Sequence, residues 1–162
     1  MKNDFNIQDG VLRAYLGTDE IVQIPENVNE IWYHAFNGKT FIKKIIIPES
    51  VTKIAHNAFS GCTGLADEQG LVILQNKVFG YYGNSSDITI PFGTVSIVQE
   101  AFSKSHIKSV LIPETVKEIA QRAFFNCSHL NRLILSEGIE RIDGGAFMWC
   151  SKLESLSVPI RY

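Results

Sequence analysis

The sequence predicts a solenoid, a stack of similar coils built mainly from short parallel β-strands joined by brief turns. Two observations lead to this fold class. An Ala-Phe dipeptide recurs five times, and each copy ends eleven residues after a fixed anchor, which is proline in four copies and Ser136 in the fifth. Successive anchors are 23, 43, 22 and 23 residues apart, and the long step is close to two periods. The dipeptides end at Phe36, Phe59, Phe102, Phe124 and Phe147, and the anchors are Pro25, Pro48, Pro91, Pro113 and Ser136, with Pro159 opening a sixth copy. A period in the low twenties indicates stacked coils, each of which needs its neighbours to bury its apolar side.

Residues 107–127 form the clearest copy of the repeat. Val110 and Ile112 alternate with polar or outward positions, which predicts a strand that ends before Pro113 because proline cannot donate a ladder hydrogen bond. Val116 and Ile119 predict a corner and a second short strand. The Ala-Phe segment is too short for a long helix, so we expect a single turn or a 3₁₀ stretch there.

The recurring alanine and phenylalanine have a packing interpretation. One position must be small so that neighbouring coils approach closely, and one must be large to fill the space between the two faces. We therefore expect the phenylalanines to form one aromatic column through the stack, with rings paired in offset or edge-on geometry. Their regular spacing favours this interpretation over an aromatic ligand box.

Each cysteine follows a repeat phenylalanine by three residues, at Cys62, Cys127 and Cys150. Free cysteine packs as a small hydrophobe, so we expect a buried thiol in each of these coils. Cys127 and Cys150 lie in consecutive coils, and a disulfide between them remains an alternative.

Composition excludes several classes of function. The formal charge is −2 and basic residues do not cluster, which argues against a nucleic-acid partner. Apolar runs are far shorter than a membrane span needs, so no membrane insertion is expected. The first residues lack the apolar core of a secretory signal, which indicates either an intracellular chain or one whose signal and anchor were removed.

No pattern of a catalytic site, a cofactor site or a metal site stands out. The sequence contains neither a phosphate-binding glycine loop nor a Cys-x-x-Cys pair. His106 and His129 share one repeat position and are expected to stack one coil apart, but no carboxylate or thiol shares that position. We expect no enzymatic activity, no cofactor and no metal.

The repeat pattern resembles a known family. Residues 47–62 read Ile-Pro, then Val51 and Ile54, then Ala58-Phe59 and Cys62, which resembles the BspA-like leucine-rich repeat family of bacterial surface proteins and some protist proteins. The similarity extends over residues 18–159. It implies a right-handed leucine-rich-repeat solenoid of about six coils, used without catalysis for adhesion to host proteins or other cells. Departures are Ser136 for proline, Thr94 in a valine position, and Lys39 and Ser105 in the cysteine position.

Two segments interrupt the period, although the chain is expected to form a single domain over residues 1–162. Residues 1–24 predict a hairpin that covers the N-terminal end of the stack, and residues 66–87 predict a second hairpin inserted in the array. A last coil begins at residue 153 and is incomplete. An open strand edge there would pair with another chain, so self-association is expected at this edge.

The strand positions that point away from the core form parallel columns, on the side that is concave in the resembled fold. Two and four residues before the anchors, apolar and charged residues occupy these columns, which indicates an interaction surface. The alternative is that β-branched residues there only favour strands. The candidate ligand-binding residues are Lys44, Ile46, Thr89, Leu111, Arg132 and Ile134. Tyr81 and Tyr82, between two glycines, form an alternative loop site, unless both pack on the coil beneath.

These observations predict a module that recognises a protein or a glycan as part of a larger cell-surface or secreted protein. A structural spacer or self-associating segment is the main alternative, and a cytoplasmic scaffold is the other. The sequence does not identify the ligand.

Overall fold

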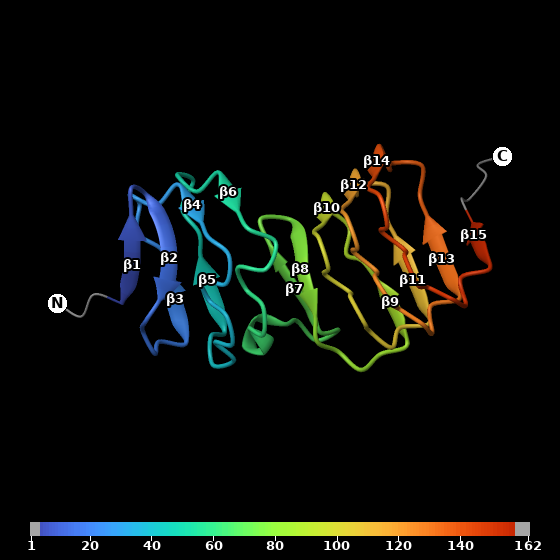
Figure 1. The fold of residues 1–162 in the computed structure, drawn as a ribbon, viewed down its shortest axis with the longest axis horizontal. Coiled ribbons are helices and arrows are strands. Elements are labelled where there is room, and N and C mark those ends of the chain that lie inside the picture. The colour runs from blue at the N-terminus through green and yellow to red at the C-terminus, as the bar shows by residue number, and fades with distance from the viewer. Residues whose placement is uncertain (1–3, 158–162) are drawn as a thin grey trace. The chain divides into compact units, whose positions relative to one another are not determined.

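A computed structural model describes residues 4–157 of the 162-residue chain (Figure 1). The chain divides into two compact units, Met1–Ala66 and Asp67–Tyr162. We call them unit 1 and unit 2 and describe each by itself. Pro159, the expected start of a sixth repeat copy, lies outside the described residues.

Unit 1 contains two small sheets. One has the order β1-β2-β4-β6 and the other pairs β3 with β5. The hairpin β1–β2 is antiparallel, and every other pair is parallel. The bounds are β1 Phe5–Gln8, β2 Val11–Tyr15, β3 Ile21–Gln23, β4 Glu30–Ile31, β5 Lys44–Ile46 and β6 Lys53–Ile54, followed by the 3₁₀ turn η1, Thr63–Leu65.

Unit 2 repeats this plan over more coils. Its first sheet has the order β9-β11-β13-β15, and its second sheet has the order β7-β8-β10-β12-β14 (Figure 1). The hairpin β7–β8 is antiparallel and all other pairs are parallel. The bounds are β7 Leu71–Leu74, β8 Lys77–Tyr81, β9 Asp87–Thr89, β10 Ser96–Ile97, β11 Ser109–Ile112, β12 Glu118–Ile119, β13 Arg132–Leu135, β14 Arg141–Ile142 and β15 Ser155–Ser157.

The two strands of each coil explain the solenoid. The strand before the anchor enters the first sheet and the strand after it enters the second, so residues one period apart become neighbours: Val110 pairs with Leu133, and Ile119 pairs with Ile142. In unit 2 the inward residues of both sheets are buried together with the Ala-Phe pairs as far as β13, whereas in the next coil Ile142 is 45% exposed and Phe147 is only partly buried. The predicted β-solenoid of about six turns, including the second short strand of each coil, is confirmed.

The predicted aromatic column is present in each unit. In unit 2, Phe124 stacks between Phe102, with ring centroids 4.8 Å apart, and Phe147, at 5.2 Å. In unit 1, Phe36 and Phe59 stack at 5.2 Å. A tyrosine from each hairpin extends the column, because Tyr15 packs on Phe36 and Tyr81 packs on Phe102, each at 5.5 Å. In each unit, the column of stacked rings therefore begins at a tyrosine of the hairpin.

The Ala-Phe segments form successive tight turns and no helix. Within residues 4–157, the single helical element is η1. Left-handed residues precede and follow the Ala-Phe pair, for example Arg122 at φ 56° and Asn126 at φ 55°. A right-handed helix cannot continue through such residues, so each segment stops after one turn. Of the short helical pieces that the sequence led us to expect, the described residues contain one, the 3₁₀ turn η1, which follows the Ala-Phe segment of its coil.

The cysteine position is a buried thiol with a defined partner. Cys62 donates its S–H to the carbonyl of Phe36 at 3.0 Å, and Cys127 donates to Phe102 at 3.1 Å, each in the preceding coil. All three cysteines are free thiols in the structure, and Cys150 is the least buried of them. Burial raises the pKa of Cys62 to about 11.

Candidate functional site

The outward columns of the first sheet form the candidate site in unit 2. Thr89, Leu111 and Ile134 lie in register on neighbouring strands, and Asp87, Ser109 and Arg132 form the parallel column two residues earlier. Leu111 is 38% exposed and Ile134 is half-buried, while Thr89 and Arg132 are exposed. The structure therefore brings together four of the six predicted residues on one sheet surface.

The other two predicted residues lie in unit 1. Lys44 and Ile46 are both exposed on β5, and their register partners on β3 are Ile21 and Gln23. Ile21 is 62% exposed, which is more than Ile46 or Leu111, the exposed apolar residues of the predicted set. It was not among the six candidates, although its position four residues before Pro25 marks it. We name these outward residues the strand columns of each unit: those of β3 and β5 in unit 1, and those of β9, β11 and β13 in unit 2.

The cations of the strand columns have no ionic partner among the described residues. Among residues 4–157, neither Lys44 nor Arg132 makes an ion pair. Asp87 accepts a hydrogen bond of 2.5 Å from the hydroxyl of Ser86. The columns therefore offer apolar side chains beside cations that are available to a partner.

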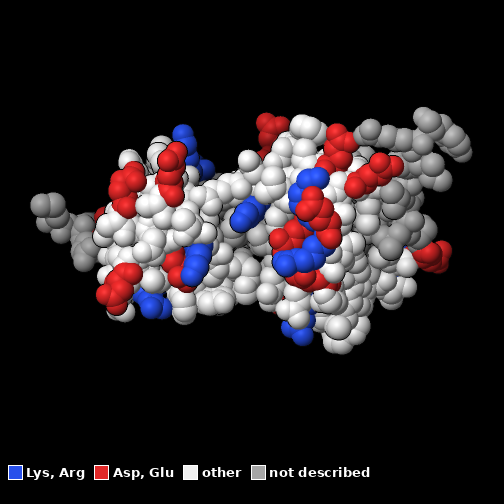
Figure 2. Space-filling model, turned by 90° about the horizontal axis from the view of Figure 1, so that it is seen from above, with Lys and Arg blue, Asp and Glu red and all other residues white. Residues whose placement is uncertain are grey.

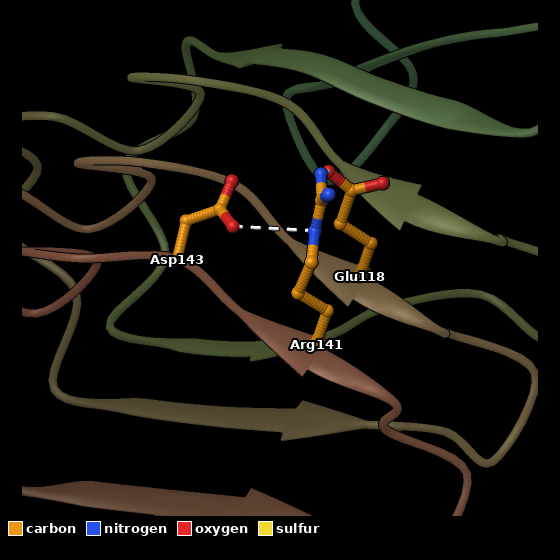
Figure 3. A network of polar contacts seen from close by, with 3 residues as sticks. All are labelled: Glu118, Arg141 and Asp143. Carbon is orange, nitrogen blue, oxygen red and sulfur yellow. Dashed lines mark hydrogen bonds and ion pairs between the residues drawn. The ribbon is translucent and has the colours of Figure 1, made fainter.

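The outward face of the second sheet differs in this respect. Arg141 on β14 forms ion pairs with Glu118 on β12 and with Asp143 (Figure 3). The Nε of Arg141 lies 3.2 Å from a carboxylate oxygen of Asp143. Lys117 pairs with Glu140 at 3.6 Å. Figure 2, seen from the side on which β10, β12 and β14 lie in Figure 1, shows acidic and basic side chains interspersed over unit 2. These opposite charges satisfy one another across neighbouring coils, as is typical of a solvated face.

The two residues of the alternative loop site have different environments. Tyr81 stacks on Phe102 and donates its hydroxyl hydrogen to the carbonyl of Ser85 at 3.0 Å. Burial raises the pKa of this phenol. Tyr82 is 39% exposed. Tyr81 is thus committed to the aromatic column, and Tyr82 alone remains as an outward ring at this loop.

A short motif that sequence reasoning missed explains the ends of the aromatic column. Tyr15 and Gly17, and likewise Tyr81 and Gly83, are separated by one residue. A Cβ on Gly17 would lie 2.6 Å from the Tyr15 ring, and a Cβ on Gly83 would lie 2.7 Å from the Tyr81 ring. The glycine is needed because the tyrosine ring folds back over it, so the repeated Tyr-x-Gly signal could have identified both tyrosines as column members.

The titratable groups of the described residues do not assemble a metal site. Within residues 4–157, no three His, Cys, Asp or Glu side chains gather closely enough to hold a metal ion. His106 and His129 stack with centroids 5.4 Å apart, as their shared repeat position predicts. The neighbouring Cys127 thiol, together with burial, raises the pKa of Cys150, whose S–H donates to the carbonyl of Phe124 at 3.0 Å. Residues 4–157 also include no helix with the length and apolar character needed to cross a bilayer.

The sequence of residues 15–67 and 72–161 matches the family described as BspA type leucine rich repeat region, in six copies. The chain therefore belongs to this family. Fold and family make it a leucine-rich-repeat protein, a class whose stacked coils present extended binding surfaces. No curated protein matches the chain.

Solved leucine-rich-repeat structures show similarity over most of the chain. A leucine rich cell surface protein from Faecalibacterium prausnitzii is 24% identical, with 84% of this chain and 52% of that one covered and a TM-score of 0.49. A T. pallidum leucine rich repeat protein is 27% identical, covers 96% of this chain and 69% of its own, and has a TM-score of 0.46. A leucine-rich repeat protein from Bacteroides ovatus is 30% identical, with 84% of this chain and 30% of that one covered and a TM-score of 0.40. The chain thus spans about half of the first of these proteins.

Proposed function

We propose that this chain is a non-enzymatic recognition module of a surface-exposed or secreted bacterial-type protein, and that the strand columns bind a protein partner. The observation that carries the proposal is the contrast between the two sheets of unit 2. The second sheet neutralises its own charges, whereas the first presents Leu111 and Ile134 beside Arg132, which makes no ion pair with any described residue. Exposed apolar side chains next to an available arginine are typical of interaction surfaces.

A direct test uses an array of purified extracellular-matrix and serum proteins as probes, since the family resemblance implies adhesion to host proteins. We expect at least one probe to bind. The double variant Leu111→Ser, Ile134→Ser should weaken that binding at least tenfold, because both apolar contacts are lost. Its melting temperature should stay near that of the wild type, since neither side chain lies in the core.

The matched control is the double variant Glu118→Gln, Arg141→Gln on the second sheet, which removes the outward charges of that face. Binding by this control should equal that of the wild type. Equal affinity of the wild type and the Leu111, Ile134 variant would move the site away from the strand columns. Analytical ultracentrifugation of the same proteins without probe distinguishes the recognition module from a self-associating segment. A self-associating segment would form oligomers in the absence of any probe.

A further inference from the structure

An exposed tryptophan occupies a strained position on the turns of unit 2. The residue two places after the repeat phenylalanine is left-handed in each of these coils: Lys104 at φ 62°, Asn126 at φ 55° and Trp149 at φ 64°. Asparagine tolerates this conformation, and glycine occupies the same place in unit 1 at Gly38. A bulky side chain is unfavourable there. Trp149 is also 65% exposed, so burial does not compensate for the strain.

Trp149 is part of an aromatic platform. Its ring lies 4.8 Å from that of Phe125 at an interplanar angle of 40°, and the neighbouring Met148 is 44% exposed. Main-chain bonds align these turns, since Asn126 N–H donates to the Met148 carbonyl at 2.8 Å. The guanidinium of Arg122 lies 5.5 Å from the centre of the Phe125 ring. The platform therefore combines apolar ring surface with a cation.

The same row of turns leads to a polar pocket. The pocket has a volume of about 250 Å³ and is lined mainly by hydroxyl, amide, imidazole and ammonium groups. Its polar lining residues include Asn84, Ser85, Ser103, Lys104, Ser105 and His106. No aspartate or glutamate contributes to the lining. Lys104 N–H donates to the Phe125 carbonyl at 2.8 Å, which places the pocket one coil from the platform.

The pocket and the platform are spaced for an elongated ligand. From Lys104 to Trp149 the row crosses two coil steps, which is about 10 Å at the usual strand spacing. His106 stacks on His129 along this row and continues the hydrogen-bonding groups toward the platform. A ligand that reaches both ends must therefore combine an apolar face with many polar groups over that length.

We propose that this row of turns binds an oligosaccharide that carries a carboxylate. A pyranose ring presents a C–H face that packs on an aromatic ring, and its hydroxyls both donate and accept hydrogen bonds, as the asparagine and histidine side chains of the pocket do. Two of the pocket serines are already engaged inside the protein, since Ser85 donates to the Asp87 carbonyl and Ser105 contacts the Cys127 thiol. Lys104 and Arg122 supply the positive charge for the carboxylate. An acidic peptide would satisfy the charges, but it lacks the hydroxyls that match the neutral lining of the pocket. This site is separate from the strand columns and does not depend on the function proposed for them.

The informative substitution is Trp149→Gly. Glycine removes the ring and relieves the left-handed strain, which offsets the greater freedom of the unfolded chain, so the melting temperature should stay near that of the wild type. We expect a hyaluronan tetrasaccharide to bind the wild-type chain in calorimetry and its affinity to fall at least tenfold in this variant. Lys104→Gly, at the same place two coils earlier, should also keep the fold while weakening the binding and its salt dependence. Chitotetraose, which has no carboxylate, should bind more weakly than hyaluronan tetrasaccharide.

Three results would overturn the proposal. They are no binding of the tetrasaccharide, unchanged affinity in both glycine variants, and preferential binding of a hexaglutamate peptide. A lower melting temperature in Trp149→Gly would instead assign the tryptophan a structural role and would also count against it. The Leu111→Ser, Ile134→Ser protein should bind the tetrasaccharide normally, so failure of the protein-binding proposal and failure of this one are distinguishable.

Discussion

Two glycines in the last described coil of unit 2 should respond in opposite ways to alanine. A Cβ on Gly138 would overlap the main-chain carbonyl of Glu114 in the preceding coil and lie 2.9 Å from its Cα. Gly144, six residues later, has nothing within 4 Å of the same added atom and no left-handed φ. The same chemical change therefore tests close coil packing at one position and open surface at the other.

The cost of Gly138→Ala follows from the bonds on each side of the overlap. Ser136 N–H donates to Ile112 at 3.1 Å, and Glu140 N–H donates to Lys117 at 2.9 Å. Separating the coils weakens both bonds, each worth about 1 kcal/mol, and adds packing strain of about 1–3 kcal/mol. We expect a loss of about 3 kcal/mol in the free energy of unfolding. Gly144→Ala should gain about 0.5 kcal/mol, because alanine restricts the unfolded chain.

Urea unfolding followed by tryptophan fluorescence measures both effects. The chain has two tryptophans, and Trp32→Phe leaves Trp149 as the reporter of unit 2. The reasoning would be refuted by a Gly138→Ala protein within 0.5 kcal/mol of the wild type, a bound set by typical surface substitutions. Equal losses at Gly138 and Gly144 would refute it as well.

The remaining predictions concern alkaline pH. Cys62 has an ordinary pKa of 9.0 and a raised pKa of about 11 in the fold, so between these values the unfolded chain has lost a proton that the folded chain retains, and stability falls as pH rises. The fall from pH 9 to pH 11 should be about 2 kcal/mol larger in the wild type than in Cys62→Ala, measured by urea unfolding, and parallel curves would contradict this. The raised pKa of Tyr81 adds a further loss above pH 10, which Tyr81→Phe should remove.

The repeated parts of the fold could be predicted because each coil applies the same packing constraint. The alternation at Val110 and Ile112, the proline that follows, and the invariant Ala-Phe spacing together determine two strands and a turn per coil. Parallel pairing one period apart then places Leu111 beside Ile134, so the strand columns also follow from the repeat. Their ligand does not follow, because outward residues are not constrained by coil packing.

The irregular parts required the structure. In each hairpin the second strand takes the place of a repeat strand, since Leu12 on β2 pairs with Ile31 and Val78 on β8 pairs with Ile97. The following tyrosine therefore enters the aromatic column, which the Ala-Phe pattern could not indicate. The backbone of Trp149 is another example, because a left-handed turn is normally signalled by glycine or asparagine rather than tryptophan.

The aromatic column is tested most directly by comparing Phe124→Ala with Phe92→Ala. Both residues lie in unit 2, but Phe124 is fully buried between two stacked rings while Phe92 is 77% exposed. Urea unfolding should show a loss of about 3–5 kcal/mol for Phe124→Ala and less than about 0.5 kcal/mol for Phe92→Ala. Similar losses for the two variants would contradict a solenoid held together by rings shared between successive coils.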